Sequence, residues 1–174
     1  MEISELKERD WFKVLLEGKS GTGKTLMSCR VALSLLDDGF RVLYLDTESE
    51  GPTTLLKVLS NQGYDEDIVE SLEYVQVETY EELMSQLDSM EQYNLVVIDT
   101  LDHKHTMTLK EVTDAKMKSE ADWNQYPKIY SSEKQMMKSI GKPDCNVLCT
   151  LDPESGSRNK PKGAQTNVQG YFTA

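Results

Sequence analysis

The chain has 174 residues, of which 38% are hydrophobic and 28% charged, a composition typical of one globular domain with an ordinary core. It holds no run of about 18 apolar residues, and its acidic start differs from a secretory signal, so we expect a cytoplasmic protein with no membrane partner. The net charge of −11 is uneven, because residues 1–100 carry 8 Lys/Arg against 21 Asp/Glu and residues 101–174 carry 11 against 9. Since an acidic surface repels nucleic acid, any such contact is expected from the second part, where Lys104, Lys110, Lys116 and Lys118 would form a basic surface or an ordinary solvated helix face.

The first predicted strand, at residues 12–16, and the first predicted helix, at residues 26–36, flank a complete G-x-x-x-x-G-K-[ST] phosphate loop. Its glycines let successive backbone N–H groups point at phosphate oxygens, beside the positive end of the helix. We expect Lys24 to reach the β and γ phosphates and the Thr25 hydroxyl to bind Mg²⁺. The predicted nucleotide-binding residues of the loop are Gly18, Lys19, Ser20, Gly21, Thr22, Gly23, Lys24 and Thr25.

Farther along the chain, strands and helices alternate. The predicted strands cover residues 41–46, 74–77, 94–99 and 145–151, and the predicted helices cover residues 52–62, 80–92 and 121–140. Because the main strands are almost continuously apolar, we expect an α/β fold in which a mostly parallel sheet is covered on both faces, in three α/β/α layers. Residues 1–174 would form a single domain with its core at about residues 12–150. Residues 151–174 would be a mobile basic tail, and the chain stops just where residues 168–172 begin another strand, as if truncated.

Ligands of such sheets bind at the carboxyl ends of the strands, so the residues that end the strands are the candidate site. Asp99 follows a strongly apolar strand, and it is predicted to hold Mg²⁺; its alternative role is to cap a turn. Glu48 is predicted to orient the attacking water, with Glu50 as a competitor and Asp46 as a support for the loop. Thr150 is predicted to touch the γ-phosphate, or else to be a simple strand-end cap before Pro153.

These segments resemble the RecA-like ATPase core, in particular that of small phage RecA-like ATPases of the single-strand annealing type and of archaeal RadB-like recombinases. The matching segments are GKSGTGKT at residues 18–25, VLYLDTE at 42–48 and LVVIDT at 95–100, with looser matches in ADWN at 121–124 and NVLCT at 146–150. The glutamate after the second strand narrows the P-loop class to RecA-like proteins. Where relatives often carry a histidine or glutamine after the sensing strand, this chain has Leu151 and Asp152.

The resemblance implies an oligomer with ATP and Mg²⁺ between subunits, acting on single-stranded DNA in recombination, annealing or repair, in the host cytoplasm if a phage encodes the chain. Lys24 and Glu48 would be the catalytic residues, and residues 102–119 and 153–169 would be mobile segments that face the DNA. In the second segment, Arg158, Lys160 or Lys162 would reach a neighbouring ATP, unless this part is simply a disordered basic tail.

Three alternative functions stay open. The chain could be an ATP-binding mediator with little hydrolysis, or a small-molecule or nucleotide kinase, although an arginine-bearing lid is hard to find in it. A GTP-binding switch lacks its N-K-x-D motif. The pair His103 and His105 makes a poor zinc site. We interpret Trp123, Tyr126 and Tyr130 as a stripe of the core or of a subunit interface, and we expect free buried thiols at Cys29, Cys145 and Cys149.

Overall fold

The structure is a computed structural model that describes residues 11–48, 53–55, 57, 61, 66–113, 125–142 and 144–152. Its centre is a sheet in which every pairing is parallel, in the order β1-β5-β4-β2-β3. The strands are β1 (Lys13–Glu17), β2 (Val42–Asp46), β3 (Glu73–Gln76), β4 (Leu95–Asp99) and β5 (Asn146–Leu151). This confirms the predicted α/β class and parallel sheet.

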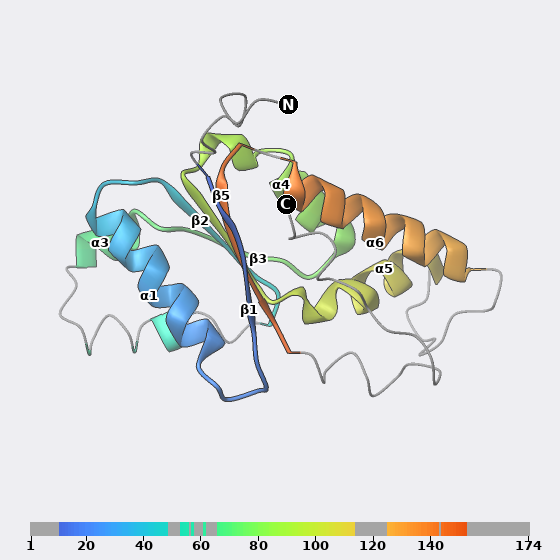
Figure 1. The fold of residues 1–174 in the computed structure, drawn as a ribbon, viewed down its shortest axis with the longest axis horizontal. Helices are drawn as coiled ribbons and strands as arrows, with labels where there is room; N and C mark the ends of the chain where they lie inside the picture. Colours follow the sequence, from blue (N-terminus) through green and yellow to red (C-terminus); the bar gives the residue numbers. More distant parts are fainter. Residues whose placement is uncertain are drawn as a thin grey trace, which may run out of the picture.

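Helices cover both faces of the sheet, as Figure 1 shows. One face packs against α1 (Lys24–Asp37) and α3 (Glu66–Glu70). The other packs against α4 (Tyr80–Leu87), α5 (Lys104–Thr113) and α6 (Tyr126–Gly141). Two short 3₁₀ turns, η2 (Met90–Gln92) and η3 (Leu101–His103), lie before and after β4. The three layers predicted from the sequence are therefore present.

Alternation along the strands assigns every side chain to one of two cores. In β2, Val42 and Tyr44 face α1, whereas Leu43 and Leu45 face the helices on the other side. All five residues of β2 and all five of β4 are buried. Because both faces of these strands are covered, they read in the sequence as continuous apolar runs, and this is why they were easy to predict.

The predicted helix at residues 80–92 is shorter than expected. Thr79 caps α4 through a reciprocal capping box with Glu82, but the helix ends at Leu87 and the chain continues into η2. The helix expected at residues 52–62 is helical at its described positions, 53–55, 57 and 61. The helix predicted from residue 121 begins at Tyr126 among the described residues, and residues 121–124 lie outside them.

The expectation of a mobile basic segment after β4 is wrong for residues 102–113. They complete η3 and form α5, which packs against α6. Lys104 is only 7% exposed, and Met107 and Thr108 are buried with it at helical spacing. Lys104 therefore belongs to no basic surface, whereas Lys110 is exposed. Because Lys104 and Thr108 are polar although they are buried, the sequence lacks the apolar periodicity that would predict this helix.

The aromatic stripe on α6 also departs from a core assignment. Tyr126 and Tyr130 lie with their ring centroids 6.3 Å apart, and Tyr130 is 54% exposed, so it lies outside the core of this chain. Trp123, Lys116, Lys118 and the predicted tail and strand beyond residue 152 lie outside the described residues. In the described part of the chain, no helix is long and apolar enough to span a bilayer.

Candidate nucleotide-binding site

The phosphate loop joins β1 to α1 and has the backbone that its glycines allow. Gly23, the N-cap of α1, has φ 91°, a left-handed conformation that favours glycine. A Cβ atom at Gly18 would lie 2.7 Å from Thr22 Oγ1. The loop is closed by the Thr22 hydroxyl, which donates to the Lys19 carbonyl at 2.8 Å. The left-handed backbone therefore favours glycine at Gly23, and a side chain at Gly18 would have to displace the Thr22 hydroxyl.

Lys24 lies at the start of α1 and folds back over the loop. Its Nζ donates to the carbonyl oxygens of Gly18 at 2.6 Å and of Lys19 at 3.2 Å. The N-terminus of α1 has no side-chain cap and no acidic residue in its first turn. Because the first N–H groups of a helix lack intrahelical partners, an uncapped N-terminus beside a lysine favours an anion. The half-buried Thr25 lies in the same turn.

The acidic strand ends come together beside this loop. Asp46 and Asp99 are aligned in the register of β2 and β4, and strand alternation puts both on the α1 side of the sheet. Thr150 lies on the same side, on β5, which separates β4 from the loop-bearing β1. All three side chains are buried, with Asp99 only 3% exposed. The structure therefore brings together the strand-end residues that the sequence singled out.

Asp99 is held by hydroxyl groups on two neighbouring strands. Tyr44 donates to its Oδ2 at 2.7 Å, and Thr150 donates to its Oδ1. Burial, and next the negative charge of Asp99, raise the pKa of Tyr44, so this hydroxyl keeps its proton and stays a donor. Thr150 thus contacts the candidate metal carboxylate directly. Its predicted contact with a γ-phosphate stays a prediction.

Asp46 is held in a parallel way by a second tyrosine. The Tyr74 hydroxyl donates to Asp46 Oδ2, and the backbone N–H of Glu48 donates to Asp46 Oδ1 at 2.8 Å. Burial, followed by the hydrogen bond to Asp46, raises the pKa of Tyr74. Asp46 therefore anchors the backbone that carries Glu48, in agreement with the supporting role predicted for it. Glu48 itself is exposed, and Glu50 lies outside the described residues.

The ends of β2, β4 and β5 are further joined by a network that sequence reasoning missed. The Thr47 hydroxyl donates to the Thr100 carbonyl at 2.7 Å and accepts from the Thr100 N–H at 2.9 Å. Thr100 Oγ1 lies 2.9 Å from the Thr150 carbonyl, and Asp102 accepts from the Asp152 N–H at 3.0 Å. The Asp99–Thr100 peptide bond is cis. The four hydrogen bonds of this network fix the strand ends relative to one another.

The residues at this site fit a magnesium nucleotide. Mg²⁺ prefers oxygen ligands and is commonly held by one or two carboxylates together with substrate phosphates. Thr25 and Asp99 offer a hydroxyl and a carboxylate, and the loop N–H groups with Lys24 suit the phosphates. Within the described ranges, no three His, Cys, Asp or Glu side chains cluster to form a complete metal cage.

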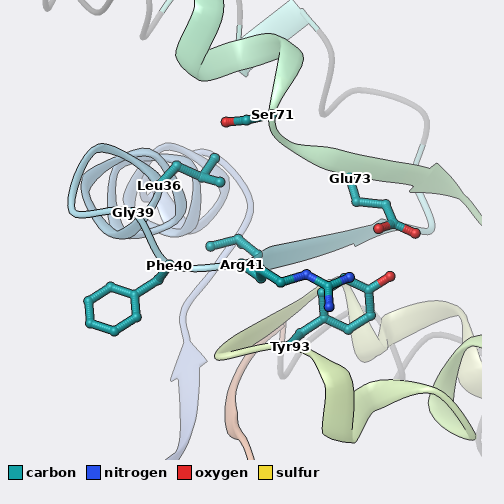
Figure 2. Close-up of a pocket in the computed structure, with 8 residues that line it drawn as sticks. Leu36, Gly39, Phe40, Arg41, Ser71, Glu73 and Tyr93 are labelled. Atoms are coloured by element: carbon teal, nitrogen blue, oxygen red, sulfur yellow. The ribbon is translucent and has the colours of Figure 1, made fainter.

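A hollow lies at the end of the sheet opposite the phosphate loop, where β2, β3 and β4 begin (Figure 2). It has a volume of about 280 Å³, and Arg41 lies over the ring of Tyr93 with 5.1 Å from Cζ to the ring centroid. Burial, and next a hydrogen bond to Glu73, raise the pKa of Tyr93 to about 12. In this hollow, Tyr93 thus contacts both Arg41 and Glu73.

The fold and the site define a P-loop nucleotide-binding domain of the α/β class. Residues 13–146 match the family described as the CobQ/CobB/MinD/ParA nucleotide binding domain, and the chain belongs to this family, CbiA. No curated protein matches the chain. The match supports nucleotide binding and the phosphate loop. The match does not support the narrower assignment to RecA-like or RadB-like proteins. It gives no evidence for an activity on single-stranded DNA.

Sequence reasoning missed Tyr44 and Tyr74, the two tyrosines on the strand-end carboxylates. Both lie within predicted strands, and no role was predicted for either of them. The available signal was their position: Tyr44 precedes Asp46 by two residues on the same face of β2, and Tyr74 pairs with Tyr44 in the register of β3. A tyrosine at such a place can extend its hydroxyl toward the carboxyl end of the sheet.

Proposed function

We propose that the chain binds ATP with Mg²⁺ and hydrolyses it as a RecA-like ATPase whose turnover is stimulated by single-stranded DNA. The observation that carries the proposal is the set of Asp46, Asp99 and Thr150, which lie on one side of three adjacent strands beside the phosphate loop. Glu48 follows Asp46 by two residues on an anchored backbone. A glutamate at this place is the feature that the RecA-like resemblance requires.

Each residue has a distinct part in this reaction. The loop N–H groups and Lys24 bind the phosphates, and Thr25 and Asp99 hold Mg²⁺, which neutralises phosphate charge when bound. Glu48 would orient the attacking water. Thr150, whose hydroxyl donates to Asp99, would also contact the γ-phosphate. The active form is a homo-oligomer with ATP between subunits. Binding of ATP there orders basic segments and so increases the affinity for DNA.

The decisive test measures phosphate release from Mg·ATP with and without single-stranded DNA. Stimulation by DNA supports the proposal, and equal rates contradict the DNA-dependent part of it. Transfer of phosphate to an added nucleoside monophosphate would favour a kinase instead. A comparison of the affinities for ATP and GTP tests which nucleotide base the site prefers.

Lys24→Ala tests the phosphate site itself. We expect ATP affinity to fall about 10-fold or more, because charge-assisted hydrogen bonds to phosphate are lost. Lys142→Ala is the matched control. Lys142 is an exposed lysine at the C-terminal end of α6, and it precedes the start of β5, at the end of the sheet opposite the phosphate loop. Unchanged ATP affinity in Lys24→Ala, measured by calorimetry, contradicts the assigned site.

A further inference from the structure

The two tyrosines at the site are stacked on one another, yet each serves a different carboxylate. Their ring centroids are 5.8 Å apart with 19° between the ring planes. The Tyr44 hydroxyl contacts Asp99, and the Tyr74 hydroxyl contacts Asp46. A packing role alone would require only the rings. The direction of the two hydroxyl groups therefore calls for a separate explanation.

Tyr44 connects the predicted metal carboxylate to the helix that begins at the phosphate loop. Its hydroxyl lies 3.2 Å from Ser28 Oγ and accepts a weak bond from Cys29 Sγ at 3.6 Å. Ser28 Oγ also lies 3.0 Å from the carbonyl of Thr25, to which it can donate. A chain of contacts thus runs from Thr25 on α1, through Ser28 and Tyr44, to Asp99 on β4. The two residues predicted to bind magnesium lie at its ends, Thr25 through its backbone carbonyl and Asp99 through its carboxylate.

Tyr74 has an equivalent connection, through Asp46, to the loop that carries Glu48. Its hydroxyl donates to one oxygen of Asp46, whose other oxygen accepts from the Glu48 N–H at 2.8 Å. Asp46 is buried, whereas Glu48 is exposed. Because a carboxylate with both oxygens engaged is held in one orientation, the backbone at Glu48 is held with it. This chain of contacts includes neither Thr25 nor Asp99.

We infer that the stacked tyrosines are two positioning residues with separate duties, Tyr44 for the magnesium site and Tyr74 for the loop that carries Glu48. The inference rests on the proposed function, because it names the residues that orient the ligands of that site. Partners that orient a metal ligand without touching the metal commonly change metal affinity or activity about 10- to 100-fold. Each hydroxyl can be removed alone by Tyr→Phe, which keeps the ring and its packing.

The test compares Tyr44→Phe with Tyr74→Phe by titrating Mg²⁺ while binding of a fluorescent ATP analogue is measured, and again while turnover is measured. In Tyr44→Phe, we expect the half-saturating Mg²⁺ concentration to rise about 10-fold, with unchanged nucleotide affinity in excess EDTA. In Tyr74→Phe, we expect an unchanged Mg²⁺ midpoint and a lower kcat. Thermal unfolding of both variants monitors folding.

Tyr93→Phe is the matched control, because Tyr93 is also buried and its hydroxyl contacts Glu73 at the far end of the sheet. It should keep the Mg²⁺ midpoint and the kcat of the wild type. Equal Mg²⁺ midpoints in Tyr44→Phe and Tyr74→Phe, or a shift in both, overturn the inference. If the wild type itself binds no Mg·ATP, the proposed function fails first, so the two failures are distinguishable.

Discussion

At the scale of single residues, the proposed hydrolysis depends on Glu48. Its backbone is anchored through Asp46, but its carboxylate lies on an exposed residue where it can meet water. The geometry is thus suited to a residue that acts on a water molecule, while buried Asp46 supports it. In the proposed function, binding and hydrolysis depend on different residues, so substitution should separate them.

We expect Glu48→Gln to lower kcat about 10²- to 10⁴-fold, because the amide cannot accept a proton, while ATP affinity stays unchanged. Single-turnover phosphate release and equilibrium binding measure the two quantities. Glu81→Gln, an exposed position on α4, is the control and should match the wild type. A wild-type rate in Glu48→Gln would direct attention to Glu50 and contradict the assignment. If the wild type binds ATP tightly but hydrolyses it very slowly, the alternative of an ATP-binding mediator is favoured.

At the scale of elements, α6 packs on the rest of the domain through its buried side chains. Met136, Met137 and Ile140 pack against the strands and α4 in the same core, and Met136 is fully buried. The exposed side chains of this helix are polar apart from Pro127 and Tyr130. The stability of α6 therefore comes from its buried face, since isolated helices of this length are marginal.

Met136→Ala should lower the free energy of unfolding by about 2–5 kcal/mol, because it leaves a cavity between α6 and the sheet. Met27→Ala is the control: Met27 is 53% exposed, and its truncation should change stability by less than about 0.5 kcal/mol. Urea unfolding followed by circular dichroism measures both. Equal losses in the two variants would contradict the packing described for α6.

The elements that were predicted well share a physical cause. β2 and β4 are buried on both faces and the phosphate loop has a strict spacing, so local sequence was sufficient for them. α5 was missed because Lys104 and Thr108 are buried polar residues that conceal its apolar side. The roles of Tyr44 and Tyr74 depend on which strands are neighbours, and strand order is not encoded in any local pattern.

At the scale of the whole molecule, charge is the main constraint on the proposed binding of DNA. The chain has a net charge of −11, yet the exposed residues of α6 include Lys128, Lys134 and Lys138 and no carboxylate. The one acidic residue of this helix, Glu133, is buried. Among the described helices, α6 thus offers an exposed face whose own charged side chains are all positive.

If α6 contacts DNA, the double variant Lys134→Glu/Lys138→Glu should weaken binding of single-stranded DNA and flatten its salt dependence. Each lost phosphate contact lowers the slope of log K against log salt by about 0.7, because fewer counterions are released. Fluorescence anisotropy of labelled DNA with Mg·ATP, at several salt concentrations, measures this slope. Arg30→Glu, on the exposed side of α1, is the control for a nonspecific change of net charge and is compared with each single variant, Lys134→Glu and Lys138→Glu, because each of these changes the net charge equally. The same slope in the double variant and the wild type would show that DNA binds elsewhere, whereas a loss restricted to the α6 variant would assign the contact to this face.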